Sequence, residues 1–186
     1  MKSLLLYVIT FVVLSSNVFA QNSLFVESEY KYSDDPSVIT YRLGAKHDFN
    51  SKISFSSFGL VNKNYAQAHF SINYKITDWL KAGVGQGIEQ SKELWRLAAN
   101  LQIMNGSYSW VTFYEHGMNG YWFQTELKYQ FNPSLSVGIF GRRFVGFGPE
   151  IAIAIPQTPF VVWTVPYAYD IESKKSGGLI VILLLF

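Results

Sequence analysis

The residues from 66 to 88 alternate between apolar and polar side chains along two consecutive segments. A turn at Thr77 and Asp78 separates the segments, and the alternation resumes at Leu80. A period of two is typical of a β-strand with one apolar and one polar face. Each segment has about ten residues, the length that a tilted strand needs to cross a bilayer. We therefore predict one hairpin of a membrane-spanning barrel. The apolar face of its first strand consists of Ala66, Ala68, Phe70, Ile72, Tyr74 and Ile76.

Similar hairpins are expected along the rest of the chain. Alternate turns are centred near residues 50, 78, 106, 133 and 158, at intervals of 25 to 28 residues. This spacing predicts an all-β, antiparallel, up-and-down transmembrane barrel of about twelve strands with short turns on both sides, and bacterial barrels have even strand numbers. Ten strands would result if the region of Pro156, Pro159 and Pro166 were irregular, because proline cannot donate to a strand ladder. The expected strands are 24–33, 38–47, 52–61, 66–76, 80–88, 95–103, 107–116, 121–130, 135–144, 151–155, 160–169 and 178–186.

The composition favours a membrane barrel over a soluble protein. Charged residues make up 15% of the chain and aromatic residues 17%, whereas soluble domains contain about 25% charged residues. Aromatic residues gather near both ends of the expected strands, as they do at the two interfaces of a bilayer. A soluble secreted β-sandwich or lipocalin-like barrel is the alternative. The chain has no cysteine, which excludes a disulfide-stapled fold and a thiol enzyme. Its formal charge of +2 gives no indication of a nucleic-acid partner.

The first 20 residues have the organisation of a cleaved signal peptide. Lys2 provides a positive charge, residues 4–14 form a short apolar run, and Val18-Phe19-Ala20 is a small-residue cleavage site. We therefore expect residues 1–20 to direct export and residues 21–186 to form a single barrel domain.

A signal peptide, regular alternating strands and a C-terminus of three leucines followed by Phe186 together resemble the outer-membrane β-barrel proteins of Gram-negative bacteria, and among them the small porins. The resemblance is one of architecture and identifies no solute. It implies a bacterial outer-membrane location, contact with outer-membrane lipid, and termini on the periplasmic side. It also implies that Phe186 is the signal that the barrel-assembly machinery recognises during insertion.

If the apolar strand faces contact lipid, the polar faces line the lumen. Their titratable side chains include eight Lys or Arg and only three Glu. A basic excess inside a low-dielectric tube attracts anions, so we predict a passive channel for small polar or anionic solutes, with no cofactor and no metal. The alternative is that Glu27 and Glu29 neutralise Arg42 and Lys46 and that the lumen is closed. The lumen-lining candidates are Glu27, Glu29, Lys31, Arg42, Lys46, His69, Lys75, Lys81, Arg96, Glu126, Lys128 and Arg142.

Two segments do not follow the simple pattern. Residues 107–116 carry aromatic side chains on both faces, so the sequence does not determine which face points inward. In the last quarter of the chain, the inward face would be apolar and would form one apolar wall of the lumen. Its expected members are Ala152, Ala154, Val162, Leu179, Val181, Leu183 and Leu185.

A lipid-modifying outer-membrane enzyme or a structural protein, built on a barrel with a closed lumen, is the competing functional class. The three histidines, His47, His69 and His116, fall on different expected strands. No nucleophile motif and no cluster of metal ligands accompanies them. We therefore expect no enzymatic activity.

Overall fold

The described part of the chain folds into twelve β-strands joined by turns. The structure is a computed structural model that describes residues 23–33, 38–90 and 94–186. The predicted signal peptide at residues 1–20 lies outside these residues. The strands are β1 (Ser23–Ser33), β2 (Val38–Asp48), β3 (Ile53–Asn62), β4 (Ala66–Lys75), β5 (Leu80–Glu89), β6 (Trp95–Asn105), β7 (Tyr108–Gly117), β8 (Gly120–Asn132), β9 (Leu135–Arg142), β10 (Gly146–Ala154), β11 (Phe160–Asp170) and β12 (Lys175–Leu185).

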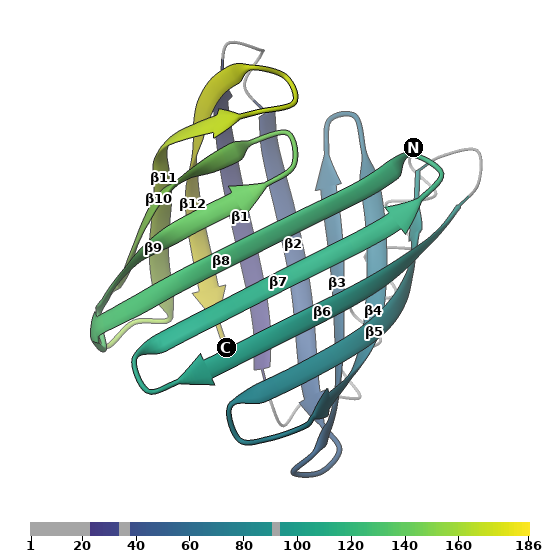
Figure 1. The fold of residues 1–186 in the computed structure, drawn as a ribbon, viewed down its shortest axis with the longest axis vertical. Coiled ribbons are helices and arrows are strands. Elements are labelled where there is room, and N and C mark those ends of the chain that lie inside the picture. The colour runs from purple at the N-terminus through teal and green to yellow at the C-terminus, as the bar shows by residue number, and fades with distance from the viewer. Residues whose placement is uncertain (1–22, 34–37, 91–93) are drawn as a thin grey trace.

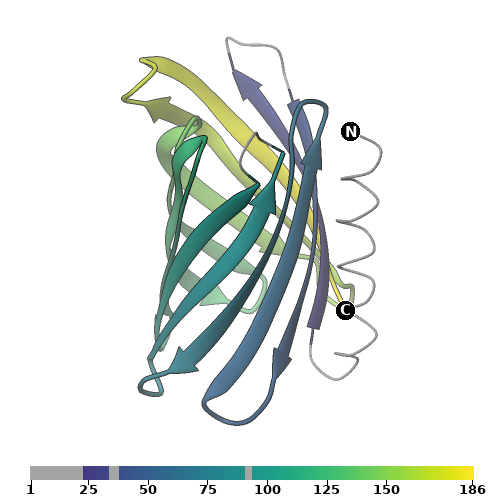
Figure 2. The ribbon, with the colours of Figure 1, turned by 90° about the vertical axis from the view of Figure 1, so that its right-hand side faces the viewer.

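The strands form one closed barrel, in which each strand pairs with its neighbours in sequence and β1 pairs antiparallel with β12. Figures 1 and 2 show the strands tilted around a single lumen. The prediction of twelve strands is confirmed and the alternative of ten is wrong. At the closing seam, the amide of Leu24 donates to the carbonyl oxygen of Phe186 at 3.1 Å, and the amide of Phe186 donates back at 2.9 Å. We name the end that holds this seam the terminal end, and the end that holds turns 63–65, 118–119 and 143–145 the distal end.

Proline 166 does not interrupt the barrel, because β11 contains a bulge at this point. The register between β11 and β12 shifts between Val165 and Ala168, so Pro166 is not required to donate to the ladder. The hydroxyl of Tyr32 on β1 donates to the carbonyl oxygen of Pro166 at 2.7 Å. Tyr32 reaches it over Gly178, where a Cβ atom would lie 2.4 Å from the tyrosine oxygen. The absence of a side chain at Gly178 therefore leaves room for the hydrogen bond from Tyr32 to Pro166.

Strand β10 begins earlier than predicted, and this changes the lumen. The sequence pattern predicts a strand only at 151–155, but the structure continues it back to Gly146 after a tight turn. Phe144 and Gly146 have φ angles of 67° and 103°, and a Cβ on Gly146 would lie 2.1 Å from the carbonyl carbon of Tyr169. Glycine thus permits the close approach of β10 and β11. As a result, Glu150 lies within a strand and faces the lumen.

The predicted alternation corresponds to an outward apolar face and an inward, mainly polar one. Outward side chains such as Ile72, Val84 and Leu97 are 56%, 70% and 54% exposed, whereas inward His69 is 1% exposed. None of the described residues forms a helix long and apolar enough to cross a membrane. Exposed aromatic rings lie near both ends of the barrel, as interfacial girdles would. They are Phe49, Tyr74, Trp79, Tyr108, Trp110 and Phe131 near the terminal end, and Tyr30, Trp95, Tyr114, Tyr167 and Tyr169 near the distal end.

One side of the lumen, formed by β9 to β12, is an apolar core. Leu179 and Val181 are fully buried there, as predicted, and Ala152 is 9% exposed. Val162 was predicted to point inward, but it is the cross-strand partner of outward-facing Ile182, and Trp163 opposite Val181 takes the inward position. Leu185, also predicted to be inside, ends β12 at the rim and is 46% exposed. The buried apolar cluster consists of Phe140, Val145, Ala152, Trp163, Val165, Ala168, Leu179 and Val181.

Candidate functional site

Strand register and alternation place the twelve lumen-lining candidates on the inward faces of their strands. Glu29, for example, is opposite Val181, and Glu126 is opposite Phe140. The candidates separate into two groups. Lys46, Lys75 and Lys81 surround a cavity at the terminal end, and the other nine occupy the middle and the distal end.

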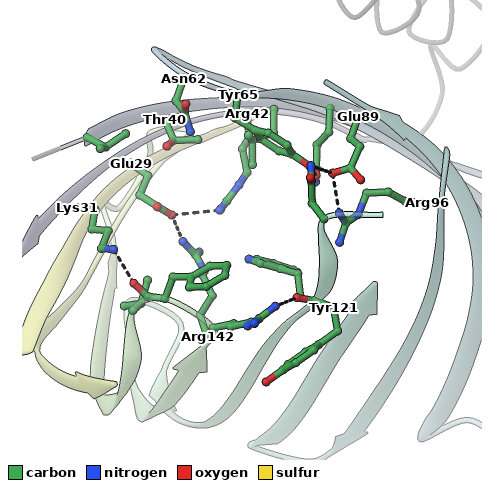
Figure 3. Close-up of a pocket in the computed structure, with 18 residues that line it drawn as sticks. Glu29, Lys31, Thr40, Arg42, Asn62, Tyr65, Glu89, Arg96, Tyr121 and Arg142 are labelled. Atoms are coloured by element: carbon green, nitrogen blue, oxygen red, sulfur yellow. Dashed lines mark hydrogen bonds and ion pairs between the residues drawn. The ribbon is translucent and has the colours of Figure 1, made fainter. Parts of the chain in front are cut away.

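A cavity of about 450 Å³, here named the distal vestibule, opens toward the distal end (Figure 3). Its charged lining contains five cations and two carboxylates, which gives it a formal excess of positive charge. Aromatic and amide side chains complete the wall, among them Tyr65, Trp122, Asn62 and Asn119. The charged lining residues are Lys31, Arg42, Arg96, Arg142, Arg143, Glu29 and Glu89.

Two arginines from opposite parts of the barrel share one carboxylate at the floor of the distal vestibule. Glu29 on β1 lies 2.5 Å from Arg142 on β9 and 3.2 Å from Arg42 on β2, and Arg42 also pairs with Glu27. Figure 3 shows both guanidinium groups pointing toward Glu29. Strands β10 to β12 separate β1 from β9 along the wall. The Glu29–Arg142 ion pair therefore crosses the lumen from β1 to β9 and narrows it.

A second network surrounds Arg96 on the opposite wall. Its Nη1 atom donates to Glu89 at 2.6 Å and its Nε atom to Glu115 at 2.7 Å. Tyr65 donates to Glu89 at 2.7 Å. The three charged side chains are no more than 3% exposed. Because the Nε2 atom of His69 lies 3.2 Å from Glu115, the network continues into the middle of the barrel.

A third group of charges lies against the apolar wall. Lys128 bridges two carboxylates, with its Nζ atom 2.7 Å from Glu126 and 2.8 Å from Glu150. The same Nζ atom lies 5.8 Å from the centre of the Trp163 ring, within range of a cation–π interaction. Phe140, Val165 and Val181 beside it have no exposed surface. Charged and apolar side chains therefore meet in this part of the lumen.

The terminal vestibule, a cavity of about 380 Å³, lies at the other end of the barrel. It is lined by four lysines and one carboxylate, together with small polar side chains. Lys46 pairs with Asp48 at 2.9 Å, and Lys75 pairs with Asp78 at 2.7 Å. The lining residues are Lys46, Asp48, Asn50, Ser51, Lys52, Ile53, Ser54, Lys75 and Lys81.

Three inward carboxylates are not among the residues predicted from the sequence: Glu89, Glu115 and Glu150. Glu89 ends a strand that was predicted to stop one residue earlier, and Glu150 was placed in a connection. Glu115 is on the segment whose facing was undetermined, and it is 1% exposed. With these residues included, acidic side chains in the middle of the lumen balance the arginines. The lumen is therefore less basic than predicted, and Arg42, Arg96 and Arg142, which line the distal vestibule, are each paired with a carboxylate. The expected pairing of Glu27 and Glu29 with Arg42 is present, whereas Lys46 pairs with Asp48 instead.

The three histidines lie in different surroundings. His69 is buried and stacked on Phe58, His47 has an edge contact with Phe49, and His116 is exposed. Glu115 points inward, away from its neighbour His116. Within the described ranges, no group of three or more His, Asp or Glu side chains is arranged to hold a metal ion.

Glu172 ties the distal turn at 171–174 to the barrel. It accepts hydrogen bonds from the Tyr121 hydroxyl and from Arg143 Nε, the latter at 3.2 Å. The Tyr121 hydrogen bond, followed by that of Arg143, lowers the pKa of Glu172 below its ordinary 4.5. A carboxylate with a lowered pKa in the folded state stabilises the protein above its unfolded pKa, and this contribution is lost as the pH falls through the folded pKa.

We therefore expect the backbone amides of 171–174 to be protected from hydrogen exchange at neutral pH and to lose protection as the pH falls below the ordinary carboxyl pKa and through the lower pKa of Glu172 in the folded state. Hydrogen exchange of the refolded protein, corrected for intrinsic rates, measures this directly. The Glu172→Gln variant should show low protection at every pH. Equal protection of this turn in both proteins at pH 7 would contradict the assigned role.

No protein-family model matches the sequence, and no curated protein matches it. Solved structures do match. The KdgM porin has a TM-score of 0.61 at 13% sequence identity, covering 87% of this chain and 99% of that chain. The fold is that of a small porin barrel. A KdgM porin in complex with disordered oligogalacturonate has a TM-score of 0.59 at 13% identity, and the NanC porin has 0.52 at 9%, both with the same coverage. The predicted porin-like architecture is therefore confirmed.

Proposed function

We propose that this chain is an outer-membrane channel for small anionic or polar solutes. The observation that carries the proposal is the presence of two basic cavities at opposite ends of one closed barrel. Cavities lined by one sign of charge raise the local concentration of oppositely charged solutes. A solute that enters either vestibule meets an excess of lysine or arginine side chains.

Between the vestibules, the path is narrow and lined by ion pairs rather than by free charges. Arg42 and Arg142 share Glu29, so a passing carboxylate or phosphate group has the chemistry to replace Glu29 as their partner. Arginine presents several N–H donors in a geometry suited to such groups. Because the Glu29–Arg142 ion pair spans the lumen from β1 to β9, we expect low conductance and transport of solutes in extended form.

The location and assembly partners belong to the same proposal. The outward apolar face with two aromatic girdles suits an outer-membrane lipid bilayer, and the termini would then lie on the periplasmic side. Phe186 is 66% exposed at the terminal end, where the barrel-assembly machinery would contact it. The fold shared with KdgM supports the channel class, and one KdgM structure is a complex with oligogalacturonate, an anionic oligosaccharide.

Single-channel recording of the refolded protein in a planar bilayer under a salt gradient tests the proposal. We expect small, discrete conductance steps with a reversal potential shifted toward the anion equilibrium potential. A protein that is folded, as judged by its gel mobility before and after heating, but gives no steps would contradict the channel assignment. Steps with cation selectivity would contradict the preference for anions.

A further inference from the structure

Three lysines form a row across adjacent strands at the terminal vestibule. Lys75 on β4 is the direct cross-strand partner of Lys81 on β5. On the other side, the Lys75 amide donates to the Lys52 carbonyl oxygen at 2.7 Å, which places Lys52 beside Lys75 just before β3. All three residues line the terminal vestibule.

Such a row is unfavourable unless something compensates its charge. Like charges directly opposite on neighbouring strands destabilise a sheet. Asp78 pairs with Lys75 at 2.7 Å, but the Asp78 side chain is 97% exposed, where an ion pair has little energetic value. Among the residues that the structure describes, Lys52 and Lys81 form no salt bridge. The lining of the terminal vestibule therefore carries four lysines against one carboxylate, Asp48, which pairs with Lys46.

The floor of the same vestibule presents an unused hydrogen-bonding group. Ser54 lines the cavity and is 1% exposed, and its buried hydroxyl has no hydrogen-bond partner in the described part of the chain. Buried hydroxyl groups ordinarily have a partner. A hydroxyl donor beneath several ammonium groups suits an oxyanion, because each group can donate to a different oxygen.

We propose that the terminal vestibule binds a phosphate group, held by Lys52, Lys75 and Lys81 with Ser54 as an additional donor. Lysine binds phosphate as a point charge, without the planar geometry that arginine requires. The site is separate from the Glu29 crossing, which lies toward the distal end. It does not depend on the channel function, because a closed barrel could bind the same group.

Binding to the full refolded protein in detergent, measured by calorimetry with inorganic phosphate, tests this site without any measurement of conductance. Sodium chloride at matched ionic strength is the reference. We expect phosphate binding to the unaltered protein. In the Lys75→Gln/Lys81→Gln double variant, we expect the affinity to fall by roughly tenfold or more, as is typical for loss of charge-assisted hydrogen bonds. The Lys75→Arg/Lys81→Arg variant should retain binding, and Lys63→Gln, which changes an exposed lysine at the distal end, should leave it unaltered.

Stability provides a second readout. Without phosphate, the double glutamine variant should have a higher midpoint of urea unfolding than the unaltered protein, because repulsion between Lys75 and Lys81 is removed. With saturating phosphate, this order should reverse. Chloride and phosphate acting equally at the same ionic strength would show screening alone and would overturn the proposal, as would unchanged binding in the double glutamine variant. Parallel titrations with glycerol phosphate and with a short-chain phosphatidic acid would distinguish a free phosphate ester from a lipid headgroup, and either supports the site.

Discussion

Replacing Glu29 by glutamine is expected to increase both the single-channel conductance and the preference for anions. Glu29 is the only carboxylate among the described residues that pairs with both Arg42 and Arg142. Loss of the Glu29 carboxylate removes the ion pair that crosses the lumen and leaves one additional uncompensated positive charge. We expect a roughly two- to tenfold increase in the anion-to-cation permeability ratio, corresponding to ~0.4–1.4 kcal/mol. The reversal potential in a salt gradient measures this ratio.

The Glu29→Asp variant separates the effect of charge from that of geometry. Aspartate keeps the negative charge, but it is one methylene shorter and does not reach Arg142 in the same way. We therefore expect higher conductance with little change in selectivity. If Glu29→Gln leaves both quantities unchanged, the pair does not control the path of the solute.

Replacing Arg96 by methionine is expected to have the largest effect on stability. Arg96 is the cation between Glu89 and Glu115, and all three side chains are buried. Removing one partner of a buried ion pair leaves uncompensated charge and typically costs about 3–5 kcal/mol. We therefore expect a large decrease in the free energy of unfolding, measured by urea titration of the refolded barrel with tryptophan fluorescence.

Two further variants show whether the cost arises from charge burial. Adding Glu89→Gln and Glu115→Gln to Arg96→Met should restore most of the lost stability, because no buried charge then lacks a partner. Arg143→Met is the matched control, since its partner Glu172 is 49% exposed and a surface pair contributes about 0–1 kcal/mol. If the single Arg96 variant were as stable as the unaltered protein, water would have to reach this network.

Most of the barrel could be predicted from the sequence, because the facing of side chains and the positions of turns depend on residues that are close together in the chain. Alternation from Ala66 to Tyr74 determines the face of each side chain, and turns such as Asn105-Gly106 determine where strands end. The errors occur where the local pattern is ambiguous. Gly146 reads as a loop residue, yet its missing Cβ is what lets β10 pair closely with β11. The inward position of Trp163 in place of Val162 depends on pairing with Val181, which a single strand does not reveal.

The candidate site could be predicted only in part, because its chemistry depends on contacts across the lumen. The sequence identified Arg42, Arg96 and Arg142 as inward residues but not their partners. Glu29 and Arg142 are 113 residues apart in the chain, and no short-range pattern connects them. Without Glu115 on the unassigned strand, the lumen was predicted to be more basic than it is. Where both faces of a strand carry aromatic side chains, alternation does not show which residues face the lumen. Glu115 is such a residue.

The interior of the barrel is asymmetric, because buried apolar side chains gather on the side formed by β9 to β12. The terminal vestibule takes its lining from β2 to β5 and the turn at 49–52, and the distal vestibule has none from the strand residues 147–185. Any route for solute is thus eccentric, because strands β10 to β12 contribute no lining residue to either vestibule. Strands β10 to β12 therefore contribute mainly apolar packing to the interior of the barrel, whereas the charged side chains that line both vestibules come from the other strands and turns.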